Sequence, residues 1–137
     1  MIKKISVFLL LTCILYSCAA DKDKKPETAM DAGREFIRAS LNGDFKIAED
    51  LLLKDTQNLQ LFESYKSSYN RFPADKKDHY RKADYVINKY LDLDDSTTII
   101  NYSNDYMNKP MDIKVVRRDH LWQIDFKYTL SGNLPID

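Results

Sequence analysis

The segment MDIKVVRRDHLWQIDFKYTL (residues 111–130) decides the fold, because apolar and polar side chains alternate along two runs that flank a short polar stretch. Alternation with a period of two is typical of a strand that buries one face. We therefore predict an antiparallel hairpin with a two-residue turn at Asp119-His120.

The register of this hairpin follows from its two faces. One face would pair apolar residues, namely Met111 with Tyr128, Ile113 with Phe126 and Val115 with Ile124. The other face would pair opposite charges, namely Lys114 with Asp125 and Asp112 with Lys127. A slip of one residue would undo both matches. The same register sets Arg117 opposite Trp122, a cation–π pair, and truncating a buried Trp122 to alanine would cost about 3–5 kcal/mol.

Two further strands precede this hairpin. Apolar residues Tyr85, Ile87, Leu91 and Leu93 alternate with Asp84, Asn88 and Asp92, and Lys89 is the one charged residue on the apolar side. Asp94-Asp95 would form a polar turn, and residues 97–103 would return as the second strand. A calcium-binding loop of the EF-hand type that began at Asp92 would need glycine at its sixth position and glutamate at its twelfth. The chain has Thr97 and Ser103 at these positions, so the stretch 92–95 is better explained as a polar turn.

Helices fill the chain before these strands. Thr28 and Asp31 form a start like a capping box, and Gly43 suits the left-handed position that ends a helix. Asp44 would begin a second helix with an apolar face of Phe45, Ala48, Leu51 and Leu52. Thr56 would open a third, with Leu59, Phe62, Tyr65, Tyr69 and Phe72 at helical spacing. Pro73 would interrupt that stretch and restart a short helix that carries Tyr80.

The order of helices followed by strands predicts an α+β fold, in which N-terminal helices pack on a curved four-stranded antiparallel sheet. The stretches FIRASLNGD (36–44) and VVRRDHLWQIDF (115–126) resemble the nuclear-transport-factor-2-like, or cystatin-like cone, superfamily. Within it, the chain is most similar to small bacterial lipoproteins of unknown function. The family usually has glycine in the last turn, where this chain has His120. The resemblance implies a cone-shaped domain, on a scaffold that hosts both enzymes and binding proteins.

The N-terminus has the pattern of a secretory signal. Lys3 and Lys4 precede an apolar run over residues 5–16, which is too short for a membrane-spanning helix of about 20 residues. The sequence Leu15-Tyr16-Ser17-Cys18 then resembles the lipobox of bacterial lipoproteins. The resemblance implies removal of residues 1–17 as a signal peptide and acylation of Cys18.

The resemblance also implies an organisation and an address. Residues 18–27 would form the lipidated cysteine and a charged tether, and residues 28–137 one α+β cone domain. Ala19 follows the cysteine where an aspartate would retain the protein at the inner membrane, so a lipid anchor in the outer membrane of a bacterial cell envelope is expected. The acids nearby leave export to the cell surface as the alternative.

Composition excludes several classes of function. The chain has 21 basic and 21 acidic side chains and no basic stripe with interleaved aromatics, which argues against nucleic acid as a partner. The two cysteines are Cys13 and Cys18, so a mature chain that starts at Cys18 would have no disulfide. No glycine-rich phosphate loop or cluster of metal ligands is present, and we expect no cofactor and no metal.

The aromatic residues and one lysine make the candidate pocket lining: Tyr65, Tyr69, Tyr85, Lys89, Tyr102, Trp122 and Tyr128. The first hypothesis is a non-catalytic lipoprotein whose domain binds a small ligand or an envelope protein. The second is a small hydrolase- or isomerase-like enzyme that uses Lys89, a tyrosine and His79 in the cone. The sequence favours the first, because His79 and His120 lie among polar residues and no acid–base pair is evident.

Overall fold

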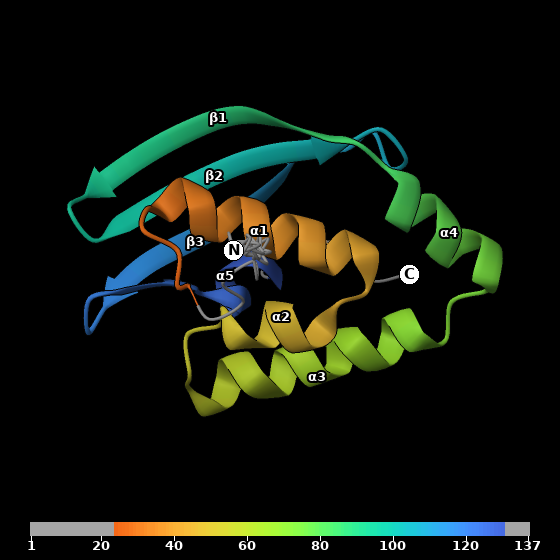
Figure 1. Cartoon of the computed structure of the whole chain (residues 1–137), viewed down its shortest axis with the longest axis horizontal. Helices are drawn as coiled ribbons and strands as arrows, with labels where there is room; N and C mark the ends of the chain where they lie inside the picture. The colour runs from red at the N-terminus through yellow and green to blue at the C-terminus, as the bar shows by residue number, and fades with distance from the viewer. Residues whose placement is uncertain (1–23, 131–137) are drawn as a thin grey trace, which may run out of the picture.

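The computed structural model describes residues 24–130, so the expected signal peptide, Cys18 and the last seven residues lie outside the described part of the chain. Helices come first and a four-stranded sheet follows, as predicted (Figure 1). The helices are α1 (Ala29–Asn42), α2 (Phe45–Asp50), α3 (Thr56–Asn70), α4 (Ala74–Lys82) and α5 (Phe126–Leu130). The strands are β1 (Tyr85–Asp94), β2 (Thr97–Asn104), β3 (Met111–Arg118) and β4 (Leu121–Ile124).

The ends of α1 have the predicted caps. The Thr28 hydroxyl accepts a hydrogen bond from the Asp31 backbone N–H at 3.1 Å and donates one to the Asp31 carboxylate at 2.7 Å. Gly43 ends the helix with a φ of 76°, a conformation that costs glycine little because it has no Cβ. A Cβ at Gly43 would also meet the ring of Tyr69 at 3.1 Å, so the C-terminus of α1 packs closely on α3.

The sheet is an antiparallel meander in the order β1-β2-β3-β4. The turn between β3 and β4 is at Asp119 and His120, both with positive φ, and Val115 lies opposite Ile124 with Arg117 opposite Trp122, as predicted. The turn between β1 and β2 comes one residue later than predicted, because β1 continues through Asp94.

The prediction that the last strand continues to Leu130 is wrong. β4 ends at Ile124, and residues 126–130 form α5, so Ile113 and Phe126 do not pair as strand residues. In a strand Tyr128 would face the core and Thr129 the solvent. Thr129 is fully buried and Tyr128 is 37% exposed, which fits the helical spacing of Phe126 and Thr129. A segment of five residues is too short for its periodicity to distinguish the two structures.

One of the two charge pairs predicted for the hairpin forms and the other does not. Lys114 Nζ lies 3.7 Å from the Asp125 carboxylate, so this pair forms even though the strand has ended. Asp112 does not face Lys127. Its carboxylate accepts a hydrogen bond from Asn101 on β2, and Lys127 pairs instead with Asp55.

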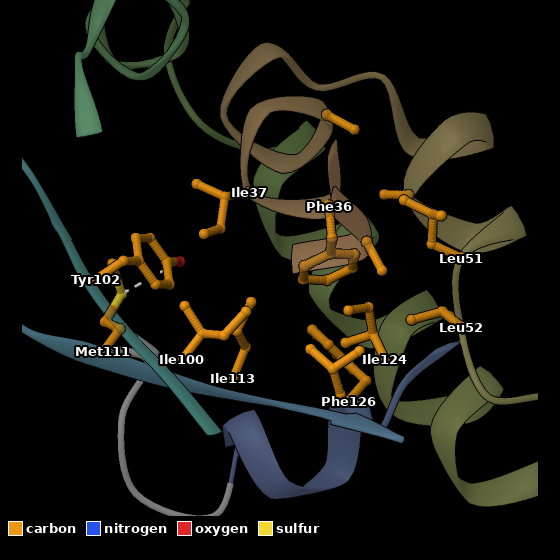
Figure 2. Close-up of a cluster of buried hydrophobic side chains, with 14 of the residues drawn as sticks. Phe36, Ile37, Leu51, Leu52, Ile100, Tyr102, Met111, Ile113, Ile124 and Phe126 are labelled. Atoms are coloured by element: carbon orange, nitrogen blue, oxygen red, sulfur yellow. Dashed lines mark hydrogen bonds between the residues drawn. The ribbon is translucent and has the colours of Figure 1, made fainter. Parts of the chain in front are cut away.

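One layer of helices covers one face of the sheet. α1 packs on β2, β3 and β4, and α3 packs on α2 and α5. Figure 2 shows the apolar side chains that meet between these layers, including Phe36 and Ile37 from α1, Ile100 from β2, Ile113 from β3 and Phe126 from α5. Phe126 makes ring contacts with Phe36 and Phe62 at 6.0 and 5.2 Å between centroids. The core is therefore assembled from both ends of the chain.

The two edges of the sheet differ. The segment after α2 runs beside β4, where the Ile124 N–H donates to the Leu51 carbonyl at 2.8 Å and the Leu53 N–H donates to the Ile124 carbonyl at 2.9 Å. β1 forms the other edge, and in the described part of the chain its one strand neighbour is β2. Across residues 24–130, none of the helices has the length and apolar character needed to cross a bilayer.

Candidate functional site

Three of the predicted pocket residues lie in or against the packed interior. Tyr65 contacts Phe45, Phe62 and Phe126, and Tyr102 is buried with its hydroxyl 3.8 Å from Met111 Sδ. Burial raises the pKa of both phenols well above 10. Tyr69 is buried against Phe45 and Phe72. These rings belong to the core and complete the packing between α1, α3 and the sheet.

The other predicted pocket residues lie nearer the surface. Tyr85 is half-buried beneath Arg38, whose guanidinium carbon is 5.3 Å from the ring centroid. The guanidinium carbon of Arg117 lies 5.7 Å from the centroid of the Trp122 ring, as the predicted cation–π pair requires. Trp122 is only half-buried, which is less than expected. Tyr128 is exposed beside Lys114 at 5.7 Å. The predicted residues are therefore divided between the core and separate surface positions.

The expected inward direction of Lys89 is wrong. The pairing of β1 with β2 shifts by one residue between Ile87 and Lys89, so Asn88 is a bulge. A bulge changes which side chains share a face. Lys89 lies opposite Asn101 on the outer face and is exposed, while Tyr90 takes the position opposite the buried Ile100. The side chain that the enzyme hypothesis places inside the cone is therefore in solvent.

The histidines do not approach a shared catalytic group. His79 is exposed on α4, and its ring stacks on Tyr106 with centroids 5.0 Å apart and planes 5° from parallel. His120 is exposed in the turn between β3 and β4. In the region described, no group of three or more histidine, cysteine, aspartate or glutamate side chains has the geometry of a metal site.

A buried polar network joins α3 to the start of α5, and sequence reasoning missed it. Asn58 is fully buried; its side-chain amide donates to Asp55 at 2.9 Å and to Asp125 at 3.3 Å, and its oxygen accepts the Lys127 N–H at 2.8 Å. Lys127 Nζ is 2.8 Å from the Asp55 carboxylate. The Asn58 backbone N–H, and then Lys127, hold the pKa of Asp55 below its usual value. All these groups satisfy one another, so the network is structural.

One local signal in the sequence could have revealed part of this network. Asp55 followed by Asn58 is a recognisable helix start, since Asp55 accepts the Asn58 backbone N–H at 2.8 Å. Nothing in the spacing linked Asn58 to Asp125 and Lys127, which are 67 and 69 residues away.

Two other surface features lie along α3 and α4. An open depression of about 560 Å³ runs along α3 and is lined by Gln60, Glu63, Ser64, Ser67, Ser68 and Arg71. Beyond it, Phe72 stacks on Tyr80, and Tyr106 meets Tyr80 edge to face. Lys76 Nζ lies 3.8 Å from the Phe72 ring centroid. Neither feature contains an evident nucleophile with its base.

The clearest exposed apolar surface lies on β1. Val86 is 60% exposed, Leu93 57%, Leu91 43% and Tyr90 41%. Figure 1 shows the turn end of the β1–β2 hairpin extending past the N-terminal end of α1, and Val86, near the start of β1, lies opposite Ser103 on the face away from the helices. Several exposed apolar residues along one unpaired strand edge are more informative than single exposed apolar residues, which are common. We take the exposed part of β1 as the candidate functional site.

The chain matches no protein-family model, no curated protein and no solved structure.

Proposed function

We propose that this protein is a lipoprotein of the bacterial cell envelope, anchored in the outer membrane through Cys18, whose domain binds a partner protein without catalysing a reaction. The lipobox-like sequence before Cys18 supports the anchor. Two or more acyl chains make such an anchor stable, because each buried CH₂ contributes about 0.8 kcal/mol. The charged tether of residues 19–27 would let the domain reach about 30 Å from the membrane, at roughly 3.3 Å per residue.

We further propose that the domain belongs to the nuclear-transport-factor-2-like, cystatin-like cone superfamily. Support comes from the order of helices before a meander of four antiparallel strands, with α1 packed across three of them. The turn at Asp119 and His120 adds to this support. His120 has a φ of 63°, a conformation that suits the glycine found there in the family.

One observation carries the choice of a partner protein over a small ligand. The predicted pocket residues are divided between the core and separate surface positions, whereas exposed apolar side chains gather on β1. A site for a small ligand is normally a concave pocket. A strand edge flanked by exposed apolar side chains suits another polypeptide.

The enzyme hypothesis has lost the feature that motivated it. It required Lys89 inside a cavity, where burial could tune its proton affinity. Lys89 is exposed on the outer face of the sheet. Support is therefore left for the binding function alone.

The anchor can be tested by cell fractionation and mass spectrometry. We expect the native protein to fractionate with membranes and to carry acyl chains on Cys18. The variant Cys18→Ser should be found in the soluble fraction. A serine variant that stays in the membrane fraction would show that the attachment has another cause.

The binding function can be tested by photo-crosslinking in cells. A photoreactive amino acid at Leu91 should give a discrete cross-linked band with another protein. The same group at Ile47, which is 46% exposed on α2, serves as the matched control and should not give that band. Equal patterns from the two positions would argue against β1 as the binding surface.

A further inference from the structure

We propose that β1 accepts an extended segment of a second protein as a fifth strand, and that this segment carries lysine or arginine beside apolar residues. The proposal names the partner of the site proposed above and so rests on that function. Three features of β1 lead to it: a free backbone edge, exposed apolar side chains on both faces, and a concentration of negative charge at one end.

The backbone edge of β1 is available for pairing. Strand order places β1 at one end of the sheet, while the chain after α2 covers the opposite end at Ile124. Among residues 24–130, the pairing partners of β1 all belong to β2. An edge strand presents unpaired N–H and C=O groups along its free side. An extended peptide can satisfy these groups by adding to the sheet.

Apolar side chains border this edge on both faces of the sheet. Val86 and Leu91 lie opposite Ser103 and Ile99, on the face away from the helices. Tyr90 lies opposite the buried Ile100, on the face toward the helices, yet remains 41% exposed. A strand added here would place alternate side chains against each of these surfaces.

The end of β1 carries a concentrated negative charge. Asp92, Asp94 and Asp95 are all exposed, and Lys89 is the one cation on the strand. Asp92 accepts the Thr98 hydroxyl at 2.6 Å, and Asp94 accepts the Ser96 N–H at 2.8 Å. The ion pairs found in the described region involve none of these three carboxylates. Their charge is therefore available to attract a basic segment and repel an acidic one.

The same charge argues against a second copy of this chain as the occupant. Residues 84–96 contain one lysine and four aspartates. Edge-to-edge pairing of two copies would bring together two segments of equal net negative charge. Segments of like net charge repel each other, which disfavours the association of two copies through this edge.

The irregularities of β1 limit what can bind. Register shifts occur between Ile87 and Lys89 and between Asp92 and Asp94, which leaves residues 89–92 as a regular stretch. Bulges and lysines on edge strands reduce indiscriminate pairing in natural proteins. A partner must therefore match a short stretch and the adjacent acids, which favours a selective contact over general aggregation.

Peptide binding provides the test, with the full-length protein purified in mild detergent. The probes are a labelled nine-residue peptide, Lys-Val-Thr-Val-Lys-Val-Thr-Val-Lys, a copy with glutamate at each lysine position, and a copy with proline at the two central valines. We expect fluorescence anisotropy to show that the lysine peptide binds at least tenfold more tightly than either of the others. Proline removes the N–H groups that a strand needs, so its effect reports backbone pairing.

A pair of charge variants separates the site from general electrostatics. Asp94→Lys with Asp95→Lys should reverse the preference, so that the glutamate peptide binds at least tenfold more tightly than the lysine peptide. Asp50→Lys with Asp75→Lys makes the same change in net charge at exposed positions on α2 and α4 and should leave the preference unchanged. Circular dichroism checks that each variant folds.

Several results would overturn the proposal. These are equal binding of the lysine and proline peptides, the same response from both charge variants, or no binding of any peptide. A dimer in light scattering that is lost in Val86→Lys would assign the edge to a second copy. None of these results bears on the anchor, and the cross-linking from Leu91 would still report whether β1 has a protein partner.

Discussion

The two hairpins of the sheet differ in what covers them. β3 and β4 lie beneath α1, with α5 and the segment after α2 closing the remaining side, and Ile113, Val115 and Ile124 are fully buried. The turn end of the β1–β2 hairpin extends past α1, and four apolar residues of its outer strand are exposed, namely Val86, Tyr90, Leu91 and Leu93, while Tyr85 and Ile87 pack against the core. Both hairpins have alternating sequences. The comparison shows that alternation predicts a strand, and that burial depends on whether a helix reaches it.

This difference suggests separate roles: the covered hairpin stabilises the fold, and the exposed part of β1 is the proposed binding surface. Apolar area that is removed from water contributes about 25 cal/mol per Å², so the covered hairpin contributes most of the sheet's stability. The exposed part of β1 contributes little to stability, and under the proposed function this area is available to a partner. Substitutions in the covered hairpin and in the exposed part of β1 should therefore have different effects on the free energy of unfolding.

The largest loss is expected from Phe126→Ala. Phe126 is 1% exposed and contacts Phe36, Phe62 and Tyr65, so its removal leaves a cavity between α1, α3 and the sheet. We expect the free energy of unfolding to fall by about 3–5 kcal/mol in urea denaturation. Leu93→Ala on β1 is the comparison variant and should change it by no more than about 0.5 kcal/mol. Similar losses for both variants would contradict the inference that the covered hairpin, and not the exposed part of β1, provides most of the stability of the sheet.

A smaller loss is expected from Asn58→Ala, which breaks the buried network. The change removes hydrogen bonds to Asp55 and Asp125 and leaves the Lys127 N–H without its acceptor. We expect a loss of about 2–4 kcal/mol, because each buried polar group left unsatisfied costs about 1–3 kcal/mol. Gln57→Ala, at the exposed neighbouring position on α3, is the control. Equal stabilities of the two variants would show that the network contributes nothing.

The contact of α1 with the sheet can be tested at Gly33. A Cβ at this position would collide with Cδ1 of Ile100, which shows how closely the helix approaches β2. We expect Gly33→Ala to cost about 1–3 kcal/mol through overpacking. Ile100→Val removes the colliding methyl group and should cancel part of that cost in the double variant. Strict additivity of the two changes would indicate that the helix lies farther from the sheet.

The pH dependence of stability should report the Asp55 carboxyl. Its pKa is lowered in the folded protein from an ordinary value of 3.8, so its contribution is complete above that value and is lost as pH falls through the folded pKa. We expect Asp55→Asn, which can still accept the Asn58 N–H, to weaken the decline of stability below roughly pH 4. Thermal unfolding between pH 2.5 and 5 measures this. If stability falls equally with pH in the wild type and in Asp55→Asn, the Asp55 carboxyl does not cause the decline.

The sequence predicted the parts of the fold that depend on local signals. Thr28, Gly43 and Pro73 marked helix boundaries correctly, and the turn at Asp119-His120 set the register of Val115 with Ile124. These features succeed because caps and turns depend on a few adjacent residues.

The errors came from contacts between distant residues. The bulge at Asn88, whose side chain bonds to Asn101 and Ser103, turned Lys89 outward. The network around Asn58 and the packing of Phe126 replaced the end of the last strand with a helical turn.

The structure does not bring the candidate pocket residues together, for a related reason. Aromatic residues were expected to line a cavity, and the spacing did not reveal that Phe36, Phe62 and Phe126 would fill the same space. Leu91 and Leu93 of β1 were expected on the buried face of the strand and are exposed, because alternation does not report how far a helix extends over a sheet.

The double variant Val86→Thr, Leu93→Thr separates binding from folding at the exposed part of β1, which we propose serves binding alone. Threonine keeps a high strand propensity, so the substitution changes the apolar surface and not the backbone. We predict an unfolding free energy within about 1 kcal/mol of the wild type for the two surface changes together, with loss of the protein cross-linked from Leu91. A loss of several kcal/mol, or a cross-link that persists at full yield in a folded variant, would contradict the account.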